Sequence, residues 1–163
     1  MRGGAVPSHM EESMKSLVKA AVLGLALMAA PSIAQAEGEG AGGDAAKGEK
    51  VFRKCKACHV ADATKNRVGP YLNGVVGRKA GTAEKYRYSK LNLAAGEAGL
   101  VWTADNMFEY LKDPSKYLVG FIKENGDAAK AKGRSKMVYK LKKEDERKDV
   151  IAYLATFSEA KTN

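Results

Sequence analysis

The sequence contains few residues that hold metals or form crosslinks. Its 163 residues include only two cysteines and two histidines. A tetrahedral zinc site needs four ligands, and no second Cys/His cluster is present to complete one. No βαβ pattern surrounds the cysteines, which argues against a thioredoxin-like dithiol. The chain also lacks a convincing alternating strand and any internal repeat, so its pattern favours an all-α domain.

Both cysteines lie in one five-residue run, Cys55-Lys56-Ala57-Cys58-His59. This C-x-x-C-H spacing is typical of c-type haem attachment. Each thiol can add to one vinyl group of the porphyrin, and the tight loop leaves the next imidazole under the iron as proximal ligand. A structural disulfide would not need His59. We therefore predict one haem c, attached covalently through Cys55 and Cys58, with His59 as a metal ligand.

The first 36 residues are typical of an export leader. A short basic region at 14–19 precedes a run of small and apolar residues at 20–30, and Ala34-Gln35-Ala36 matches an A-x-A cleavage site. We predict a signal peptide over 14–36, cleaved after Ala36, and interpret 1–13 as an artificial leader or a misassigned start. An uncleaved membrane anchor is disfavoured because the apolar run is too short to span a bilayer comfortably. Residues 37–163 would then form a single periplasmic domain.

Removing the predicted leader narrows the candidate ligands and partners. His59 becomes the only histidine, and Met107 and Met137 become the only methionines, so a second histidine ligand from the same chain is excluded.

Three of the 28 Lys and Arg residues and two of the 19 Asp and Glu residues lie in the leader, which leaves a net charge of +8. A basic excess suits nucleic acid, an anionic membrane or an acidic protein partner. Export from the cytoplasm argues against nucleic acid as the partner.

Apolar spacing and capping residues predict three principal helices. Asp44 can cap a first helix that continues as far as Cys55. A second helix is expected to begin after Thr103 and to stop before Pro114. The last opens at Glu144, where a run of acidic residues suits the positive end of a helix.

Short helices and long loops are expected between the principal helices. The short helices are predicted near 89–95 and 115–120. The Gly- and Pro-containing stretch at 60–81 and the Lys-, Gly- and Ala-rich stretch at 121–134 are predicted to be loops, the second of them exposed. Such a chain has a modest core for its size, and a covalently held haem would fill the missing apolar volume.

Besides the C-x-x-C-H run, further stretches along the whole domain match the sequence pattern of one protein family. They are Lys47-Gly48-Glu49-Lys50-Val51-Phe52, Val68-Gly69-Pro70-Tyr71-Leu72, Gly77-Arg78-Lys79-Ala80-Gly81, Tyr86, Tyr88, Trp102, Tyr110-Leu111-Lys112-Asp113-Pro114, Ser135-Lys136-Met137 and Asp149-Val150-Ile151-Ala152-Tyr153-Leu154. Together they resemble class I cytochromes c, most closely the bacterial c2 type. The resemblance implies the class I cytochrome c fold, with three principal helices, short helices and long loops around one covalent haem. Compared with short family members, the chain has insertions near 95–99 and over 121–134.

The resemblance also implies a complete haem site. Met137 matches the distal metal ligand, and a thioether opposite His59 raises the reduction potential. Pro70 matches the residue whose carbonyl accepts a hydrogen bond from His59 Nδ1. Tyr110 matches the tyrosine whose hydroxyl approaches the methionine sulfur, with core packing as its alternative role; Met107 is interpreted as a core residue. The residues that match hydrogen-bond donors to the haem propionates are Arg78, Tyr88 and Trp102.

A haem with both axial positions filled has no open site for a substrate, so the resemblance implies a one-electron carrier and not an enzyme. A haem enzyme or gas sensor would need an open sixth position, which Met137 argues against. The implied protein is a soluble, monomeric periplasmic shuttle of respiration or photosynthesis. Its implied donor is a quinol–cytochrome c oxidoreductase, and its implied acceptor is a reaction centre, a terminal oxidase or a reductase. We further expect a basic collar for docking onto acidic faces of these partners, formed by Lys54, Lys56, Lys79, Lys116, Lys136 and Lys140.

Overall fold

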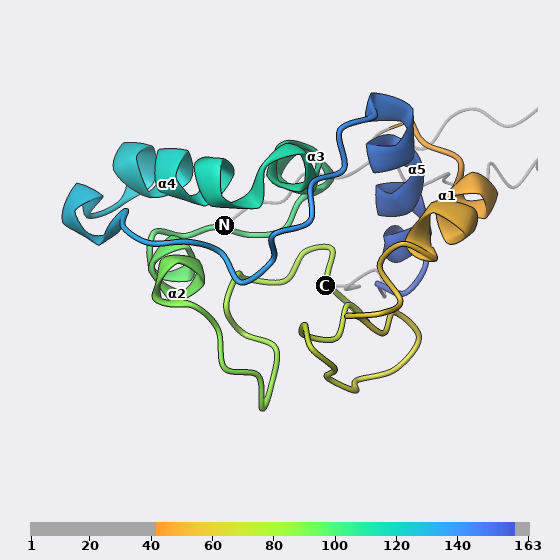
Figure 1. The fold of residues 1–163 in the computed structure, drawn as a ribbon, viewed down its shortest axis with the longest axis horizontal. Helices are drawn as coiled ribbons and strands as arrows, with labels where there is room; N and C mark the ends of the chain where they lie inside the picture. Colours follow the sequence, from red (N-terminus) through yellow and green to blue (C-terminus); the bar gives the residue numbers. More distant parts are fainter. Residues whose placement is uncertain (1–41, 159–163) are drawn as a thin grey trace, which may run out of the picture. The chain divides into compact units, whose positions relative to one another are not determined.

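The structure is a computed structural model that describes residues 42–158. The predicted leader at 1–13 and the predicted signal peptide at 14–36 lie outside the described residues. Figure 1 shows the described part as helices joined by long loops. The elements are α1 (Ala45–Phe52), α2 (Lys90–Glu97), α3 (Ala104–Lys112), α4 (Pro114–Asn125), the 3-10 helix η1 (Ala128–Lys130) and α5 (Glu144–Ala155).

The predicted all-α class is confirmed. Residues 42–158 form no β-strand, and their one extended pairing is an isolated antiparallel bridge between Lys79 and Val101. The stretch at 60–81 contains no helix, as predicted. Within the described residues, no helix has both the length and the apolar character needed to cross a membrane.

Side-chain caps start the helices where the sequence predicts. Asp44 accepts hydrogen bonds from the backbone N–H groups of Ala46 and Lys47, at 2.9 and 3.0 Å. Thr103 accepts one from the N–H of Asn106 at 3.2 Å. These bonds satisfy donors that a first helical turn leaves without a partner. No side-chain cap starts α5, but the acidic residues of its first turn complement its positive end.

The first helix is shorter than predicted. It ends at Phe52, and the chain continues through tight turns in which Cys55 N donates to Phe52 O at 2.8 Å. The prediction that Cys55 lies on this helix was therefore wrong. Hydrogen bonds between residues three apart replace the helical pattern here, as is common where a helix ends and its last carbonyls need partners.

The helix α4 contradicts the first part of the loop predicted over 121–134. Asp113 caps it, and it continues to Asn125, well beyond the predicted short helix. Leu118 and Ile122, four residues apart, are both completely buried, so one face of the helix packs into the core. The sequence did not reveal this face, because it rests mainly on two apolar positions and the neighbouring Lys and Gly residues are typical of a loop.

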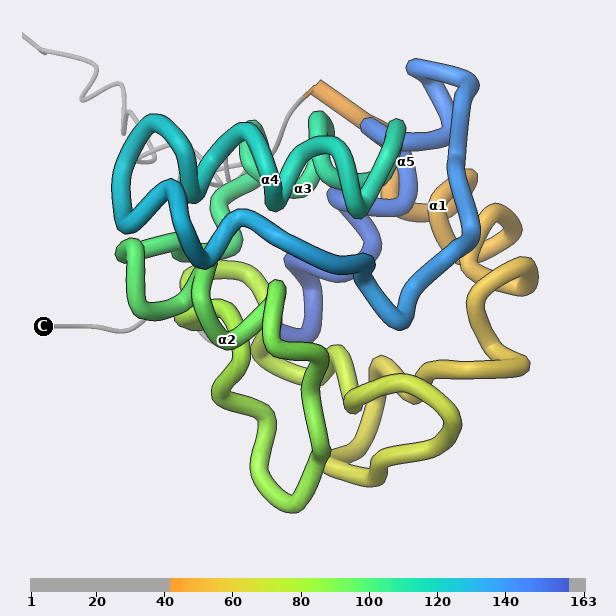
Figure 2. The backbone as a smooth tube through the Cα atoms, turned by 60° about the vertical axis from the view of Figure 1, so that its left-hand side comes forward, coloured from red at the N-terminus to blue at the C-terminus, as the bar shows by residue number. Residues whose placement is uncertain are grey.

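The helices α1 and α5 come from opposite ends of the described chain and cross in direct contact (Figures 1 and 2). Gly48 lies at the crossing, where a Cβ atom would stand only 1.9 Å from the backbone oxygen of Asp149. Beside it, the rings of Phe52 and Tyr153 pack with centroids 5.4 Å apart. The crossing fixes the segment that follows α1, which contains both cysteines.

Candidate functional site

A cavity of about 350 Å³ lies in the described domain, within the size range of small-molecule and cofactor pockets. Its walls come from the end of α1, the loops on either side of α2, α2 itself, α3, the segment after η1, and α5. Most of the lining is apolar. Every site residue predicted from the sequence lines this cavity: Cys55, Cys58, His59, Pro70, Arg78, Tyr88, Trp102, Tyr110 and Met137.

The turn after α1 brings both thiols and the imidazole to the cavity wall. The backbone N–H groups of Cys58 and His59 both donate to the carbonyl of Cys55, at 3.0 and 2.9 Å. The two cysteines are half-buried and not joined by a disulfide. Burial raises the pKa of the Cys55 thiol to about 11, so the thiol is protonated at neutral pH. Because no disulfide occupies them, both sulfurs are available for thioether bonds.

His59 is held in one tautomer. Its Nδ1 lies 2.7 Å from the carbonyl oxygen of Pro70, and because a carbonyl only accepts, the proton sits on Nδ1. The Nε2 lone pair is then free to bind a metal. Burial lowers the pKa of His59, although the bond to Pro70 partly opposes this, so the ring stays neutral. Gly69 packs against the ring, and a Cβ there would lie 2.4 Å from His59 Cε1.

Met137 reaches the cavity from a segment that Ser135 fixes. The Ser135 hydroxyl is buried, accepts a hydrogen bond from Met137 N at 3.2 Å and lies 3.4 Å from the Tyr110 hydroxyl. The backbone N–H of Ser135 donates to Ser115 Oγ at 3.1 Å. Burial raises the pKa of Tyr110 to about 12, which keeps this hydroxyl protonated. Sequence reasoning missed Ser135 as a site residue, although it stands in the matching stretch Ser135-Lys136-Met137.

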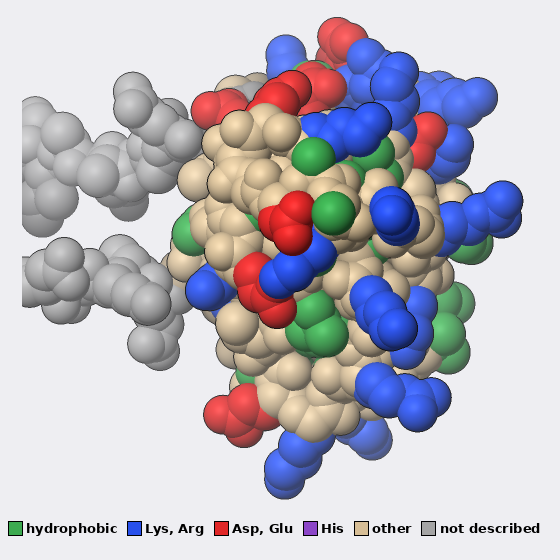
Figure 3. All heavy atoms as spheres, turned by 90° about the vertical axis from the view of Figure 1, so that its left-hand side faces the viewer, with side chains coloured by type: hydrophobic (Ala, Val, Ile, Leu, Met, Phe, Trp, Pro, Cys, Tyr) green, Lys and Arg blue, Asp and Glu red, His purple; other side chains and the backbone are tan. Residues whose placement is uncertain are grey.

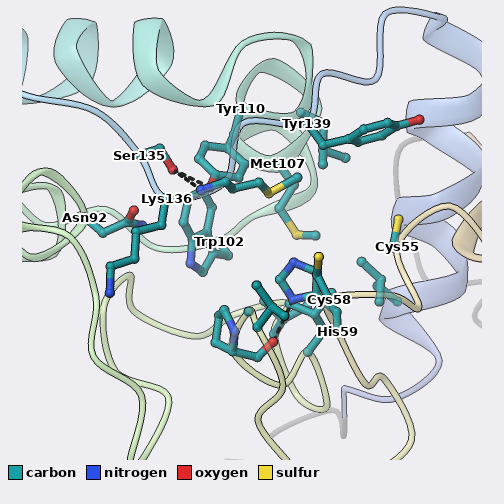
Figure 4. Close-up of a pocket in the computed structure, with 18 of the residues that line it drawn as sticks. Cys55, Cys58, His59, Asn92, Trp102, Met107, Tyr110, Ser135, Lys136 and Tyr139 are labelled. Carbon is teal, nitrogen blue, oxygen red and sulfur yellow. Dashed lines mark hydrogen bonds between the residues drawn. The ribbon is translucent and has the colours of Figure 1, made fainter.

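Met107 also lines the cavity, so the site contains two thioethers. It is 5% exposed and belongs to α3, as expected of a core residue. The cavity wall thus combines soft sulfur donors with one imidazole nitrogen, a donor set that suits haem iron. Figure 4 shows the arrangement, with Cys58 and His59 at one side of the cavity and Met107, Tyr110, Ser135 and Lys136 at the other.

Three side chains with hydrogen-bond donor groups line the remaining wall, and hydrogen bonds within the protein already orient two of them. Arg78 donates to the carbonyl of Tyr71 at 2.8 Å and stacks 4.7 Å from the Tyr71 ring centroid. Tyr88 accepts a hydrogen bond from Ala83 N at 3.2 Å. Trp102 is largely buried, yet its indole N–H donates to no other described residue. Because Trp102 lines the cavity, its donor is open to an acceptor bound there.

Asn92 is a second residue that sequence reasoning missed. It lies on α2, is 7% exposed and lines the cavity. The sequence could have indicated it, because Asn92 stands between two leucines in the short helix predicted near 89–95. A buried amide needs hydrogen-bond partners, so Asn92 adds one more polar group to an otherwise apolar wall.

Comparisons with known proteins agree with this donor set. The cytochrome c family model matches residues 45–158. Cytochrome c2 of Rhodopseudomonas palustris is 60% identical over 113 residues, which cover 69% of this chain and 97% of that protein. The solved structure of cytochrome c2 from Rhodospirillum centenum is 57% identical with a TM-score of 0.69, and the match covers 71% of this chain and 99% of that chain. Cytochrome c-551 of Roseobacter denitrificans is 45% identical over 85% of this chain and 94% of its own length.

Fold, donor set and comparisons converge on one assignment. The thiols of Cys55 and Cys58 stand where a haem c would be joined, and the apolar cavity beside them provides the space. Proteins of this family are electron carriers and not enzymes. The chain therefore belongs to the cytochrome c family as a class I bacterial cytochrome of the c2 type, with one haem c attached through Cys55 and Cys58.

Proposed function

We propose that this cytochrome is a periplasmic one-electron shuttle whose iron is held between His59 and Met137. The observation that carries the proposal is the hydrogen bond from His59 Nδ1 to the Pro70 carbonyl. It leaves Nε2 as the donor atom in a cavity that Met137 also lines. The haem supplies the redox chemistry, since its iron takes up and releases one electron.

The protein side chains restrict the site to electron transfer. If His59 and Met137 occupy both axial positions, no coordination site remains for a substrate. Burial holds His59 neutral, and its bond to Pro70 makes the ring a stronger donor. Apolar walls such as Leu72, Val75 and Leu154 exclude water, which limits the solvent reorganisation that accompanies a change of charge.

The rim of the cavity has the character of a transient docking surface. Val68 and Val138 are 77% and 81% exposed, and both line the cavity together with the exposed Tyr139. All six lysines of the proposed collar are exposed. Figure 3 presents one face of the molecule, on which Lys and Arg side chains dominate one half. An apolar centre with a basic surround suits brief encounters with acidic partners.

The collar is only partly compensated by acidic residues. Lys54 pairs with Glu146 at 2.7 Å, and Lys140 pairs with Asp113 at 2.6 Å. The other collar lysines form no ion pair within residues 42–158, so their charge can act on a partner.

The proposed electron donor is a quinol–cytochrome c oxidoreductase, and the proposed electron acceptor is a reaction centre, a terminal oxidase or a reductase. We propose that the mature carrier acts as a monomer.

The absorption spectrum of the holoprotein, produced with its haem-attachment machinery and exported, tests the function. Sharp ferrous bands and a weak sulfur–iron charge-transfer band in the ferric form are expected, because a low-spin haem with a thioether ligand produces both. A five-coordinate, high-spin spectrum would contradict the shuttle. The mass of the exported protein also tests the predicted cleavage after Ala36.

Electron transfer to an acidic partner is expected to slow as salt is added. The Debye length falls from about 30 Å at 0.01 M to about 10 Å at 0.1 M ionic strength, so steering by the collar is screened. Stopped-flow rates for Lys56→Glu should be lower at low salt and should depend less on salt than wild-type rates. Lys47→Glu, which changes a lysine on α1 outside the collar, is the matched control. Wild-type rates that stay constant with salt would refute docking by the collar.

A further inference from the structure

The segment that contains Met137 is fixed at two points. At its start, the Ser135 hydroxyl and backbone N–H bond to Met137 N and Ser115 Oγ. At its end, Leu141 N donates to the carbonyl of Leu111 on α3 at 2.8 Å. Between these points, Val138 and Tyr139 are exposed. The position of Met137 therefore depends on how firmly both ends are held.

A buried arginine holds the second end. Arg147, on α5, is 1% exposed, and one of its terminal nitrogens donates to the carbonyls of Leu141 and Lys142 at 3.1 and 2.6 Å. Its guanidinium stacks 4.2 Å from the ring centroid of Phe108 on α3. One side chain thus joins α5, α3 and the end of the Met137 segment.

Packing alone does not account for this arginine. Its Nε is buried without a hydrogen-bond partner in the described residues. The one ion pair that the guanidinium forms there is a long one, in which Nη2 lies 3.7 Å from Oε1 of the exposed Glu144. Desolvating a guanidinium with an unsatisfied N–H is costly, and an apolar side chain of similar volume is often the more stabilising choice. What an apolar residue cannot provide is a pair of charge-assisted hydrogen bonds to backbone carbonyls.

We propose that Arg147 is a positioning residue that keeps Met137 at the iron by fixing the carbonyls of Leu141 and Lys142. The inference rests on the ligand role proposed above for Met137. Without the guanidinium, both carbonyls are buried or half-buried acceptors that lose their charged donor. At this end the segment then keeps only the bond from Leu141 to α3 and the exposed ion pair between Lys140 and Asp113, and it opens more often.

The test measures how often Met137 leaves the iron in the folded holoprotein. Imidazole binds ferric iron only after the native ligand departs, so its binding rate at saturating imidazole reports the opening rate. Arg147→Met keeps the stem over Phe108 and removes every donor; we expect opening to accelerate about tenfold or more, as for the loss of hydrogen bonds to a charged donor. Arg147→Lys keeps the charge and one donor group, so its opening rate should lie between that of the wild type and that of Arg147→Met.

A second substitution separates positioning from general stability. Ile151 is a fully buried residue of α5 that does not line the cavity. Ile151→Ala lowers stability through a cavity, and it should leave the imidazole rate unchanged at a temperature well below unfolding. Equal acceleration in Ile151→Ala and Arg147→Met would overturn the positioning role, as would a wild-type rate in Arg147→Met.

The ferric spectrum and the opening rate separate the role of Arg147 from the ligand role of Met137. A wild-type ferric protein without a sulfur–iron band would refute Met137 as ligand, whatever Arg147 does. A wild-type band together with unchanged opening in both arginine variants refutes only the positioning role. If Arg147→Met does not accumulate as holoprotein, the Arg147→Lys rate decides, because faster opening supports the inference and a wild-type rate refutes it.

Discussion

Replacing Met137 by alanine is expected to abolish the sulfur–iron charge-transfer band of the ferric protein. The same change should lower the reduction potential by on the order of a hundred millivolts or more, since axial ligands set haem potentials over a range of about 0.8 V. The physical reason is that a neutral, soft thioether favours the ferrous state, and water or another side chain in its place does not. Spectroscopy at neutral pH and redox titration measure the two effects.

The control is the other methionine of the cavity. Met107→Leu conserves volume in a buried position, so it should cost less than about 1.5 kcal/mol and keep the band. The pair of variants therefore assigns the ligand. A band that survives in Met137→Ala and disappears in Met107→Leu would reverse the assignment and place the ligand on α3.

Replacing Gly48 by alanine is expected to destabilise the fold by at least about 3 kcal/mol, the upper end of the usual cost of overpacking. The new Cβ would meet the Asp149 oxygen at 1.9 Å and the Asp149 carbon at 2.6 Å. Both are backbone atoms on α5, so no side-chain rotation relieves the clash and the two helices must separate. Chemical denaturation of the holoprotein measures the loss as a lower midpoint.

A second helical glycine isolates the clash from helix propensity. Gly120, on α4, has open space where its Cβ would stand. Gly120→Ala should therefore stabilise the protein by about 0.5–1 kcal/mol, the usual gain from removing a glycine inside a helix. If both variants were stabilised, the close approach of α1 and α5 would be disproved.

Local signals in the sequence predict most of the helix starts. Asp44 and Thr103 cap the helices that they were expected to cap, because capping depends on residues only two or three positions apart. The failure at α4 has a different cause. Its buried face rests on Leu118 and Ile122, and their burial depends on the elements packed above them, which composition does not reveal.

The site shows the same division between local and tertiary information. The spacing of Cys55, Cys58 and His59 specifies its own chemistry, because the three residues meet through one turn. Ser135 and Arg147 gain their roles only from tertiary burial. A serine or arginine in a sequence is usually exposed, so nothing marked these two as buried hydrogen-bonding groups. The pairing of Lys54 with Glu146 was equally invisible, since the partners are far apart in the chain.

The crossing of α1 and α5 also sets an order of events during biosynthesis. A chain made from its N-terminus presents Cys55 and Cys58 long before the last helix exists. Until α5 arrives, the face of α1 that holds Gly48 and Phe52 has nothing to pack against, and contacts between such distant segments form slowly. During this interval, the cavity beside the thiols lacks the wall that Val150 and Leu154 of α5 supply. Attachment of the cofactor can precede closure of the fold, and the last helix to be synthesised completes the enclosure.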